Sequence, residues 1–365
     1  MPSLKIEDFI KNSVLGLTAY KVNEPQGQGS FKTGGALKLD ANESNYTLSK
    51  KIKRSYANFI KDTLINLYPD SSSGDLIKLL EIFYDIPVRN FIFGNGSDEL
   101  IAIILLSLKK NVVVNIPTPS FSMYDIVARY NDLKINRIRL EEKYFDLPKD
   151  IDADQNYFNN IFFFSYPNNP TGNHFDRNTI KSLLKNKNNI VVVDEAYIYF
   201  SDVESFIKDI PEYDNLIVLR TFSKIGLAGL RFGMLFSGNK LINEFKKIKL
   251  PFNINSLTLS SIEFFLNNFD EFDKNIKKTI SQRNKLYSAL KKFNFMEVYP
   301  SDANFILIRL RDNKLKIKFK QFLEDNKIII RSFDGNMKMF YRITVGTPAE
   351  NKKLIDYFRV FKTVH

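Results

Sequence analysis

The chain has 365 residues, of which 44% are hydrophobic and 26% charged, and its formal net charge at pH 7 is +12. It contains no cysteine and only two histidines, which excludes disulfides, thiol catalysis and cysteine-ligated zinc and argues against a histidine-based triad. No apolar stretch suits a membrane span or a signal peptide, so we expect a cytoplasmic protein without a membrane partner.

The positive charge raises the question of a nucleic-acid partner. The lysines are scattered along the whole chain, and no basic arm or recognised nucleic-acid motif occurs. We therefore interpret the charge as a solvated surface that also attracts a phosphorylated small molecule, and we expect no nucleic acid to bind. A basic nucleic-acid-binding protein is the alternative from a different class.

Residues 1–35 are interrupted by glycine and proline, and we expect them to form an N-terminal arm. An amphipathic pattern predicts a helix over residues 49–65. Beyond residue 75 strands and helices alternate, and the strands are continuous apolar runs, which is typical of a parallel sheet covered on both faces. The expected strands span residues 91–93, 111–115, 160–165, 190–194, 216–219 and 231–237.

A second domain is expected after this alternation. The pattern predicts a long helix over residues 269–292 and strands over residues 304–310, 328–332 and 341–345. We therefore predict an α/β fold with a large domain over residues 36–252 and a smaller α+β domain over residues 253–365.

Lys224 follows the apolar run of residues 215–219 and ends the segment Arg220-Thr-Phe-Ser-Lys224. It is therefore expected at the carboxyl edge of the sheet, where ligands bind in open α/β proteins. A lysine at this edge can bond covalently to an aldehyde cofactor. One more surface lysine in a lysine-rich chain is the alternative.

Other expected strands also end in polar groups. Residues 94–98 open a helix whose N–H groups favour an anion, or else Ser97 or Asp98 is an ordinary helix cap. Asn169 lies in a proline-flanked turn, and Asp194 ends a hydrophobic strand, where a carboxylate needs a cationic partner unless it caps a helix.

Together these groups match the needs of pyridoxal phosphate, which requires an amine, a carboxylate, hydrogen-bonding groups for its ring oxygen, an anion site and a flat surface. The candidates are Lys224 for the aldehyde, Asp194 for the ring nitrogen, Asn169 and Tyr197 for the ring oxygen, Phe121 for the ring face, and Gly96, Ser97, Asp98, Thr221, Ser223 and Arg231 for the phosphate. Phe121 taken alone is equally explained as a core residue. No metal is expected.

Several motifs resemble those of fold-type-I aminotransferases, namely residues 166–172, 193–197 and 220–231. Residues 39–43, 68–70 and 341–347 are similar to the histidinol-phosphate aminotransferases in particular. The resemblance runs in order over nearly the whole chain. It implies a mostly parallel seven-stranded sheet flanked by helices, a smaller α+β domain and a pyridoxal-phosphate-dependent transaminase.

The resemblance also implies a homodimer with shared active sites, in which Tyr68 reaches the cofactor phosphate of the neighbouring subunit. It implies that Arg331 and Arg342 receive the acidic groups of substrates, and that Tyr20 and Asn42 line the substrate entrance. Arg342 lies in an apolar strand, where an unpaired charge is costly. An anionic substrate or a structural ion pair is therefore expected beside it.

The implied reaction moves an amino group between glutamate and a phosphorylated ketone, with Lys224 moving the proton and Asp194 keeping the ring nitrogen protonated. Histidinol phosphate is the leading substrate, with dihydroxyacetone phosphate as an alternative. Decarboxylation of a phosphorylated amino acid is a second alternative. The segment that follows Asn42 lacks the Asn-Glu-Asn-Pro sequence usual in the family, which leaves the amino substrate open.

Overall fold

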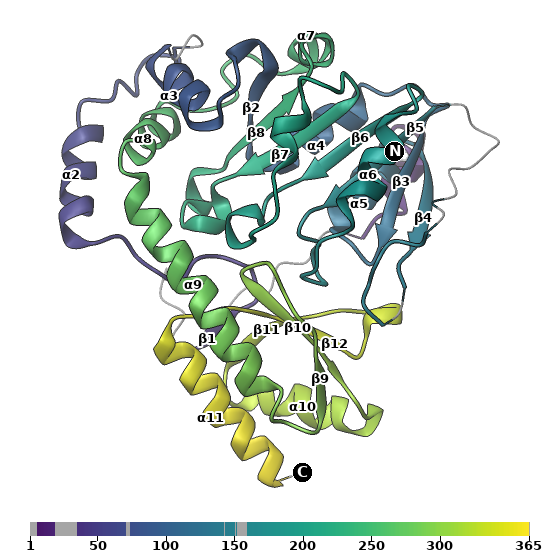
Figure 1. Ribbon diagram of the computed structural model, residues 1–365, viewed down its shortest axis with the longest axis vertical. Helices are drawn as coiled ribbons and strands as arrows, with labels where there is room; N and C mark the ends of the chain where they lie inside the picture. Colours follow the sequence, from purple (N-terminus) through teal and green to yellow (C-terminus); the bar gives the residue numbers. More distant parts are fainter. Residues whose placement is uncertain are drawn as a thin grey trace, which may run out of the picture.

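The computed structural model describes residues 6–18, 35–70, 74–141, 143–149, 151 and 159–364, and within them the chain forms two sheets (Figure 1). The larger sheet has seven strands in the order β2-β8-β7-β6-β5-β3-β4. They are β2 (Phe91–Asn95), β3 (Val113–Thr118), β4 (Lys134–Arg139), β5 (Asn160–Ser165), β6 (Asn189–Asp194), β7 (Leu216–Thr221) and β8 (Phe232–Ser237). Only β8 runs against its neighbours, so the predicted mostly parallel seven-stranded sheet is confirmed.

Helices cover both faces of this sheet, which explains its apolar strands. In β5, Phe162 and Phe164 pack on one face while Ile161 and Phe163 pack on the other, and all four are fully buried. Helices α3 (Gly74–Tyr84), α6 (Arg177–Leu184) and α8 (Ser256–Leu266) cover the first face, and α4 (Gly96–Leu106), α5 (Ser122–Tyr130) and α7 (Asn239–Ile248) cover the second. Burial of each such phenylalanine contributes about 1.5–3 kcal/mol of transfer free energy.

The smaller sheet has five strands in the order β1-β11-β12-β10-β9. They are β1 (Leu37–Leu39), β9 (Met296–Val298), β10 (Phe305–Leu310), β11 (Ile328–Ser332) and β12 (Phe340–Thr344). Helices α10 (Asn313–Asp325) and α11 (Pro348–Val364) share its core. Strand β1 pairs with β11. The first strand that the structure describes therefore belongs to the smaller sheet, although most of that sheet follows the larger one in sequence. The predicted boundary between the domains at residue 252 stays a prediction. It assigns β1 to the large domain, although β1 belongs to the smaller sheet.

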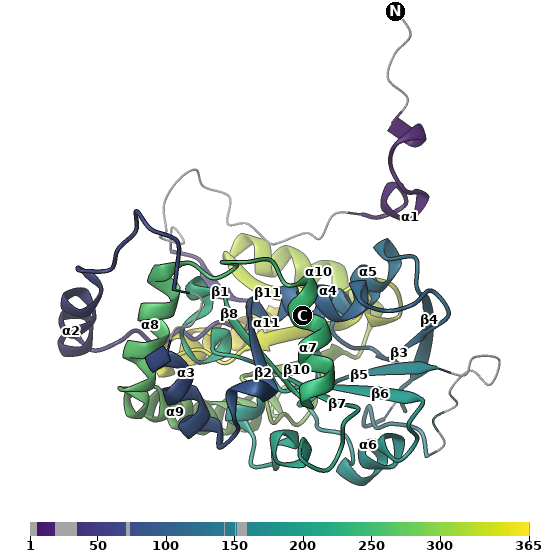
Figure 2. The ribbon, with the colours of Figure 1, turned by 90° about the horizontal axis from the view of Figure 1, so that it is seen from above.

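The long helix α9 (Phe269–Leu290) runs from the larger sheet to the smaller one (Figure 1). Helix α2 (Lys50–Ile60) lies at the side of the molecule next to α8 (Figure 2). It begins where the Ser49 hydroxyl accepts the N–H of Ile52, and it ends five residues before the predicted limit. The short α1 (Asn12–Leu15) contacts α5.

A cavity of about 1190 Å³ lies between the carboxyl edge of the larger sheet and the smaller sheet. Its walls include residues from the ends of β3, β5, β6 and β7, together with residues of β11 and β12. The carboxyl edge of a parallel sheet is the expected position for a ligand site.

Candidate active site

Lys224 extends into this cavity from a short helical turn, η5 (Ser223–Ile225), which directly follows β7. The turn is fixed because the Thr221 hydroxyl accepts the N–H of Ser223 (3.1 Å) and itself donates to the carbonyl of Phe232 (2.9 Å). The Lys224 Nζ lies 5.8 Å from the centre of the Tyr197 ring. The amine is thus held close to the end of the neighbouring strand β6.

Asp194 ends β6 and is buried at the wall of the same cavity. Its Oδ2 accepts the hydroxyl hydrogen of Tyr124 (2.7 Å), and its Oδ1 accepts the N–H of Ala196 (3.1 Å). Burial raises the pKa of Asp194 to about 6, although both hydrogen bonds and the charge of Lys224 act in the opposite direction. A cationic group bound in the cavity would therefore stabilise the ionised carboxylate.

Tyr197 and Asn169 lie on the same cavity wall, and each is oriented by a second residue. The Asn42 Nδ2 donates to the Tyr197 hydroxyl (2.9 Å), so the Tyr197 hydrogen is directed elsewhere. The Arg342 Nη1 donates to the Asn169 Oδ1. The amide nitrogen of Asn169 can therefore donate a hydrogen bond into the cavity. Both side chains are thereby arranged as donors.

Asn42, which the resemblance places at the substrate entrance, lines the cavity and is buried. It is only 1% exposed, and its φ of 56° lies in the left-handed region that asparagine tolerates. Its N–H donates to the Thr344 hydroxyl (3.0 Å), and its carbonyl accepts from the Asn304 Nδ2 (2.9 Å). The segment after β1 is thus fastened to the smaller sheet.

The amino-terminal end of α4, which the sequence predicts as an anion site, lies beside Arg231. Gly96 has a φ of +75°, and its N–H donates to the carbonyl of Arg231 (2.6 Å). A Cβ on Gly233 would lie 2.4 Å from the Gly96 carbonyl carbon, so only glycine permits this approach of β8. The guanidinium of Arg231 pairs with the Asp98 carboxylate (2.6 Å). A helix terminus with an adjacent arginine favours a bound phosphate.

Arg331 and Arg342 lie directly opposite each other on the antiparallel strands β11 and β12. Both line the cavity, and Arg342 is buried, with its Nη2 donating to the carbonyl of Asp40 (2.6 Å). Like charges at opposite positions of neighbouring strands repel each other. An anion between the two guanidinium groups would relieve this repulsion.

The structure brings together nearly all the predicted site residues. Those that line the cavity are Asn42, Ser97, Asp98, Phe121, Asn169, Asp194, Tyr197, Thr221, Ser223, Lys224, Arg231, Arg331 and Arg342. Gly96 precedes Ser97 at the start of α4 and does not line the cavity itself. Tyr68 is not in the cavity of its own chain: it is 80% exposed and stacks on Phe252, with ring centres 4.7 Å apart. Tyr20 lies outside the described residues.

Tyr124 is a site residue that sequence reasoning missed. It is fully buried, and it touches Asp194 rather than the open cavity. The signal was a tyrosine on the apolar face of a short helix, three positions after Phe121. A buried tyrosine hydroxyl usually has a hydrogen-bond partner near by.

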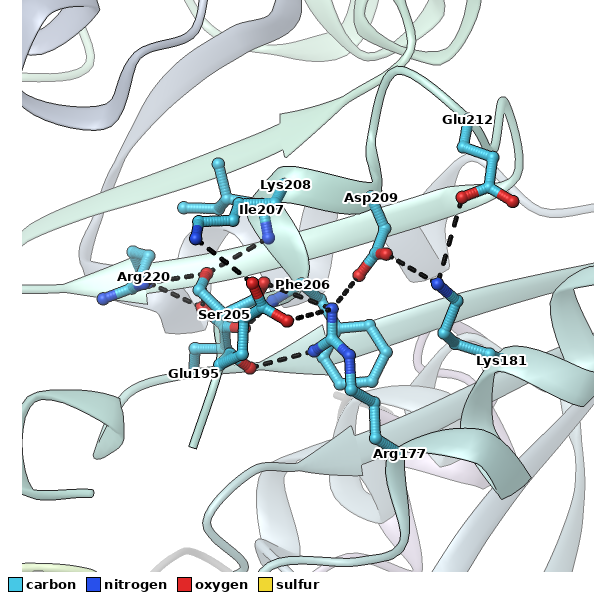
Figure 3. A network of polar contacts seen from close by, with 11 residues as sticks. Arg177, Lys181, Glu195, Ser205, Phe206, Ile207, Lys208, Asp209, Glu212 and Arg220 are labelled. Atoms are coloured by element: carbon cyan, nitrogen blue, oxygen red, sulfur yellow. Dashed lines mark hydrogen bonds and ion pairs between the residues drawn. The ribbon is translucent and has the colours of Figure 1, made fainter. Parts of the chain in front are cut away.

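A buried polar network next to Asp194 was also missed (Figure 3). The fully buried Glu195 carboxylate accepts the Ser205 hydroxyl (2.7 Å) and the N–H of Phe206 (2.6 Å), and it pairs with the Arg220 Nε (2.8 Å). Glu195 adjoins Asp194 in sequence, as Arg220 adjoins Thr221. The network therefore fixes the ends of β6 and β7, from which site residues project. Its sequence signal was a pair of opposite charges at the ends of apolar strands.

Two further properties concern the described residues as a whole. Their helices include none that is both long and apolar enough to span a membrane. They also contain no group of three or more histidine or acidic side chains arranged to hold a metal ion.

The fold and the site define the class of protein. The sequence profile of the aminotransferase class I and II family matches residues 35–358, so the chain belongs to this family. It is a pyridoxal-phosphate-dependent transaminase, as the motifs predicted.

Within this class the chain resembles proteins described as histidinol-phosphate aminotransferases. One from Vesicomyosocius okutanii subsp. Calyptogena okutanii (strain HA) is 36% identical over 330 residues, covering 89% of this chain and 92% of the relative. One from Clostridium novyi (strain NT) is 39% identical over 327 residues, covering 88% and 90%. The enzyme from Sinorhizobium meliloti, solved in complex with pyridoxal-5'-phosphate, has a TM-score of 0.77 at 20% identity, covering 89% and 91%.

The side chains of the cavity fit this cofactor. An amine, a buried carboxylate with a raised pKa, two oriented donors and a helix terminus beside an arginine all face one cavity. The carboxylate is the informative group, because burial penalises its charge unless a cation binds beside it. The protonated ring nitrogen of pyridoxal phosphate is such a cation.

Proposed function

We propose that this transaminase moves an amino group between glutamate and a small phosphorylated ketone, with histidinol phosphate and imidazole acetol phosphate as the leading pair. The observation that supports this most directly is the pair of arginines, Arg331 and Arg342, opposite each other in the cavity that also holds Lys224. A carboxylate and a phosphate both suit such a pair. The names of the relatives point to the same substrate.

The roles of the residues nearest the reaction follow from their positions. When bound, pyridoxal phosphate supplies an aldehyde that takes up the amino group and a ring that withdraws electrons. Lys224 would hold the cofactor through its Nζ, and the same amine would take the proton from the substrate carbon that bears the amino group. Asp194 would place a negative charge beside the ring nitrogen, and Tyr197 and Asn169 would donate hydrogen bonds to the ring oxygen.

The cofactor phosphate would bind at the start of α4. Ser97, Thr221 and Ser223 contribute hydroxyl groups, and Arg231 contributes charge. The Asp98 carboxylate orients Arg231 through the ion pair between them. Phe121 would lie against the ring as its flat, apolar surface.

We also infer that the protein acts as a homodimer in which Tyr68 completes the site of the neighbouring subunit. In one chain, residues 64–68 expose large apolar side chains, with Leu64, Ile65 and Leu67 exposed by 62%, 77% and 59%. Tyr68 itself stacks on the half-exposed Phe252. Contiguous apolar surface of this kind marks interaction sites, and a second copy of the chain would cover it. Sedimentation at low concentration tests this, and a fully active monomer would contradict it.

The experiment that tests the proposed substrate separates the two half reactions. Glutamate should convert the bound cofactor to its amine form, which is followed by absorbance. Imidazole acetol phosphate should then return it to the aldehyde form, and the unphosphorylated ketone should react far more slowly. Equal rates with and without the phosphate would contradict the proposal. Rapid turnover of dihydroxyacetone phosphate, with none of imidazole acetol phosphate, would make dihydroxyacetone phosphate the substrate. Release of carbon dioxide from a phosphorylated amino acid would show that the reaction is a decarboxylation.

A matched pair of variants links this preference to the arginines. Arg331→Gln should abolish most of the preference for the phosphorylated ketone by raising its KM roughly tenfold to a hundredfold. Arg309→Gln is the control, because Arg309 lies on β10 of the same sheet with its guanidinium over Phe340 and is not part of the cavity wall. It should leave the preference intact.

A further inference from the structure

Tyr124 is held rigidly against Asp194. It is fully buried on α5, with its ring stacked on Phe163 (centres 5.0 Å apart, planes at 29°) and in edge contact with Phe121 (5.5 Å, 87°). Its hydroxyl donates to the Asp194 Oδ2 at 2.7 Å. The two ring contacts hold the phenol oxygen in place, so it cannot move away from the carboxylate without disturbing the core.

The hydroxyl of Tyr124 remains a donor at any working pH. Burial raises its pKa well above that of an exposed tyrosine, and the negative charge of Asp194 raises it further. The proton of this hydrogen bond therefore belongs to Tyr124, and Asp194 accepts it as a carboxylate.

Few other groups favour the ionised form of Asp194. Among the described residues, its hydrogen-bond donors are the Tyr124 hydroxyl and the Ala196 N–H. The charge of Lys224 also favours ionisation, whereas burial and the charge of Asp98 oppose it. Tyr197 is a further titratable neighbour, and its charge would raise the pKa of Tyr124. Tyr124 is thus the side-chain donor that offsets the burial of the carboxylate.

We propose that Tyr124 is a positioning residue for transamination, whose hydroxyl keeps Asp194 ionised and oriented toward the ring nitrogen of the cofactor. This inference rests on the role proposed for Asp194. Tyr124 acts through Asp194 and needs no contact with substrate. With Oδ2 bound by Tyr124 and Oδ1 by Ala196, rotation of the carboxylate is restricted before the cofactor arrives, which is the preorganisation that electrostatic catalysis requires.

The test is a titration of Asp194 in the cofactor-free protein. Aspartate is labelled with carbon-13 at the carboxyl carbon, and the Asp194 signal is assigned by its loss in Asp194→Asn. Tyr124→Phe keeps the ring and removes only the donor. It should raise the proton affinity of Asp194 about tenfold or more, a pKa increase of about one unit. An unchanged pKa in folded Tyr124→Phe would overturn the proposal.

Tyr130→Phe is the matched control, because it removes a hydroxyl from the last residue of the same helix. It should leave the Asp194 titration unchanged, and an equal shift in both variants would overturn the proposal. If Tyr124→Phe fails to fold, 3-fluorotyrosine at position 124 makes the hydroxyl a stronger donor with little change in size. It should lower the pKa of Asp194, and no change would overturn the proposal.

Kinetics of the reconstituted enzyme provide the second readout. Tyr124→Phe should lower kcat by about tenfold or more with little change in the KM for glutamate, and the acidic limb of the rate profile should move to higher pH. Failure of the proposed function has a different signature. If glutamate does not convert the cofactor of the wild-type protein to its amine form, the proposed use of glutamate is contradicted. A shift of the Asp194 pKa in Tyr124→Phe would still establish the link between the two side chains.

Discussion

The side chain of Asn42 joins the two sheets at the active site, because its Nδ2 donates to the Tyr197 hydroxyl at 2.9 Å. Asn42 follows β1 of the smaller sheet, and Tyr197 follows β6 of the larger sheet. The hydrogen bond is buried. The position of the smaller sheet is thereby coupled to the donor that we assign to the ring oxygen.

Asn42→Gly should lower kcat by roughly tenfold, because a buried hydrogen bond worth about 1–1.5 kcal/mol is lost and the Tyr197 hydroxyl is no longer oriented. Steady-state kinetics with glutamate measure the effect. Asn42→Ala loses the same bond and adds strain, since φ is 56°. The two variants should therefore have equal kcat values, and the free energy of unfolding of Asn42→Ala should be lower by about 1 kcal/mol. Wild-type activity in the glycine variant would show that the hydrogen bond is unimportant.

The cofactor-free protein should lose stability as the pH rises through the titration of Asp194. Burial raises the pKa of Asp194 to about 6, above the value of about 3.9 in an unfolded chain. The folded state therefore binds the proton more tightly. The contribution of Asp194 to stability is full below about pH 4, falls between about pH 4 and 6, and is lost above about pH 6.

Asp194→Asn lacks this titration and provides the comparison. Between about pH 4 and 7 its free energy of unfolding should rise by about 2–3 kcal/mol relative to the wild type. Urea denaturation of both cofactor-free proteins at several pH values measures the difference, which should shrink when pyridoxal phosphate is added to the wild type. A difference that is independent of pH would contradict the buried, titrating carboxylate.

Gly233→Ala should weaken cofactor binding without unfolding the protein. The added Cβ would lie 2.4 Å from the Gly96 carbonyl carbon and 2.6 Å from the Ser97 nitrogen, so the start of α4 must move. Overpacking of this kind costs about 1–3 kcal/mol, and we expect the Kd of pyridoxal phosphate to rise at least about tenfold. Gly229→Ala is the control, because a Cβ there meets no atom within 4 Å. Equal affinities of the two variants would argue against an anion site at α4.

The sequence predicted the central strands and most of the site for the same physical reason. Strands β5, β6 and β7 are buried on both faces, so they are continuous apolar runs, and polar residues such as Asp194 and Lys224 stand out where each run ends. Strand β4 was not predicted, because it lies at the sheet edge and only Ile138 of its six residues is buried. Its sequence therefore lacks an apolar run.

Other features could not be read from local patterns. The last expected strand of the larger sheet begins at Phe232 rather than at residue 231, because Arg231 adopts a left-handed conformation. Tyr124 carries no motif, and its role depends on the distance from α5 to the end of β6, which lies two positions from β3 in the sheet order. The role that we propose for Tyr68 would require a second subunit, so neither a strand pattern nor the cavity of one chain can reveal it.

The most direct test of the account is to locate the cofactor on the chain. The purified protein, reconstituted with pyridoxal phosphate, is reduced with borohydride and digested, and the peptide that carries the cofactor is identified by mass spectrometry. The account predicts a single labelled peptide with the modification on Lys224, and no labelled peptide from Lys224→Ala, which should still bind some cofactor through the anion site. Stoichiometric labelling of any other lysine in the wild-type protein would contradict the assignment of Lys224 and the active site built around it.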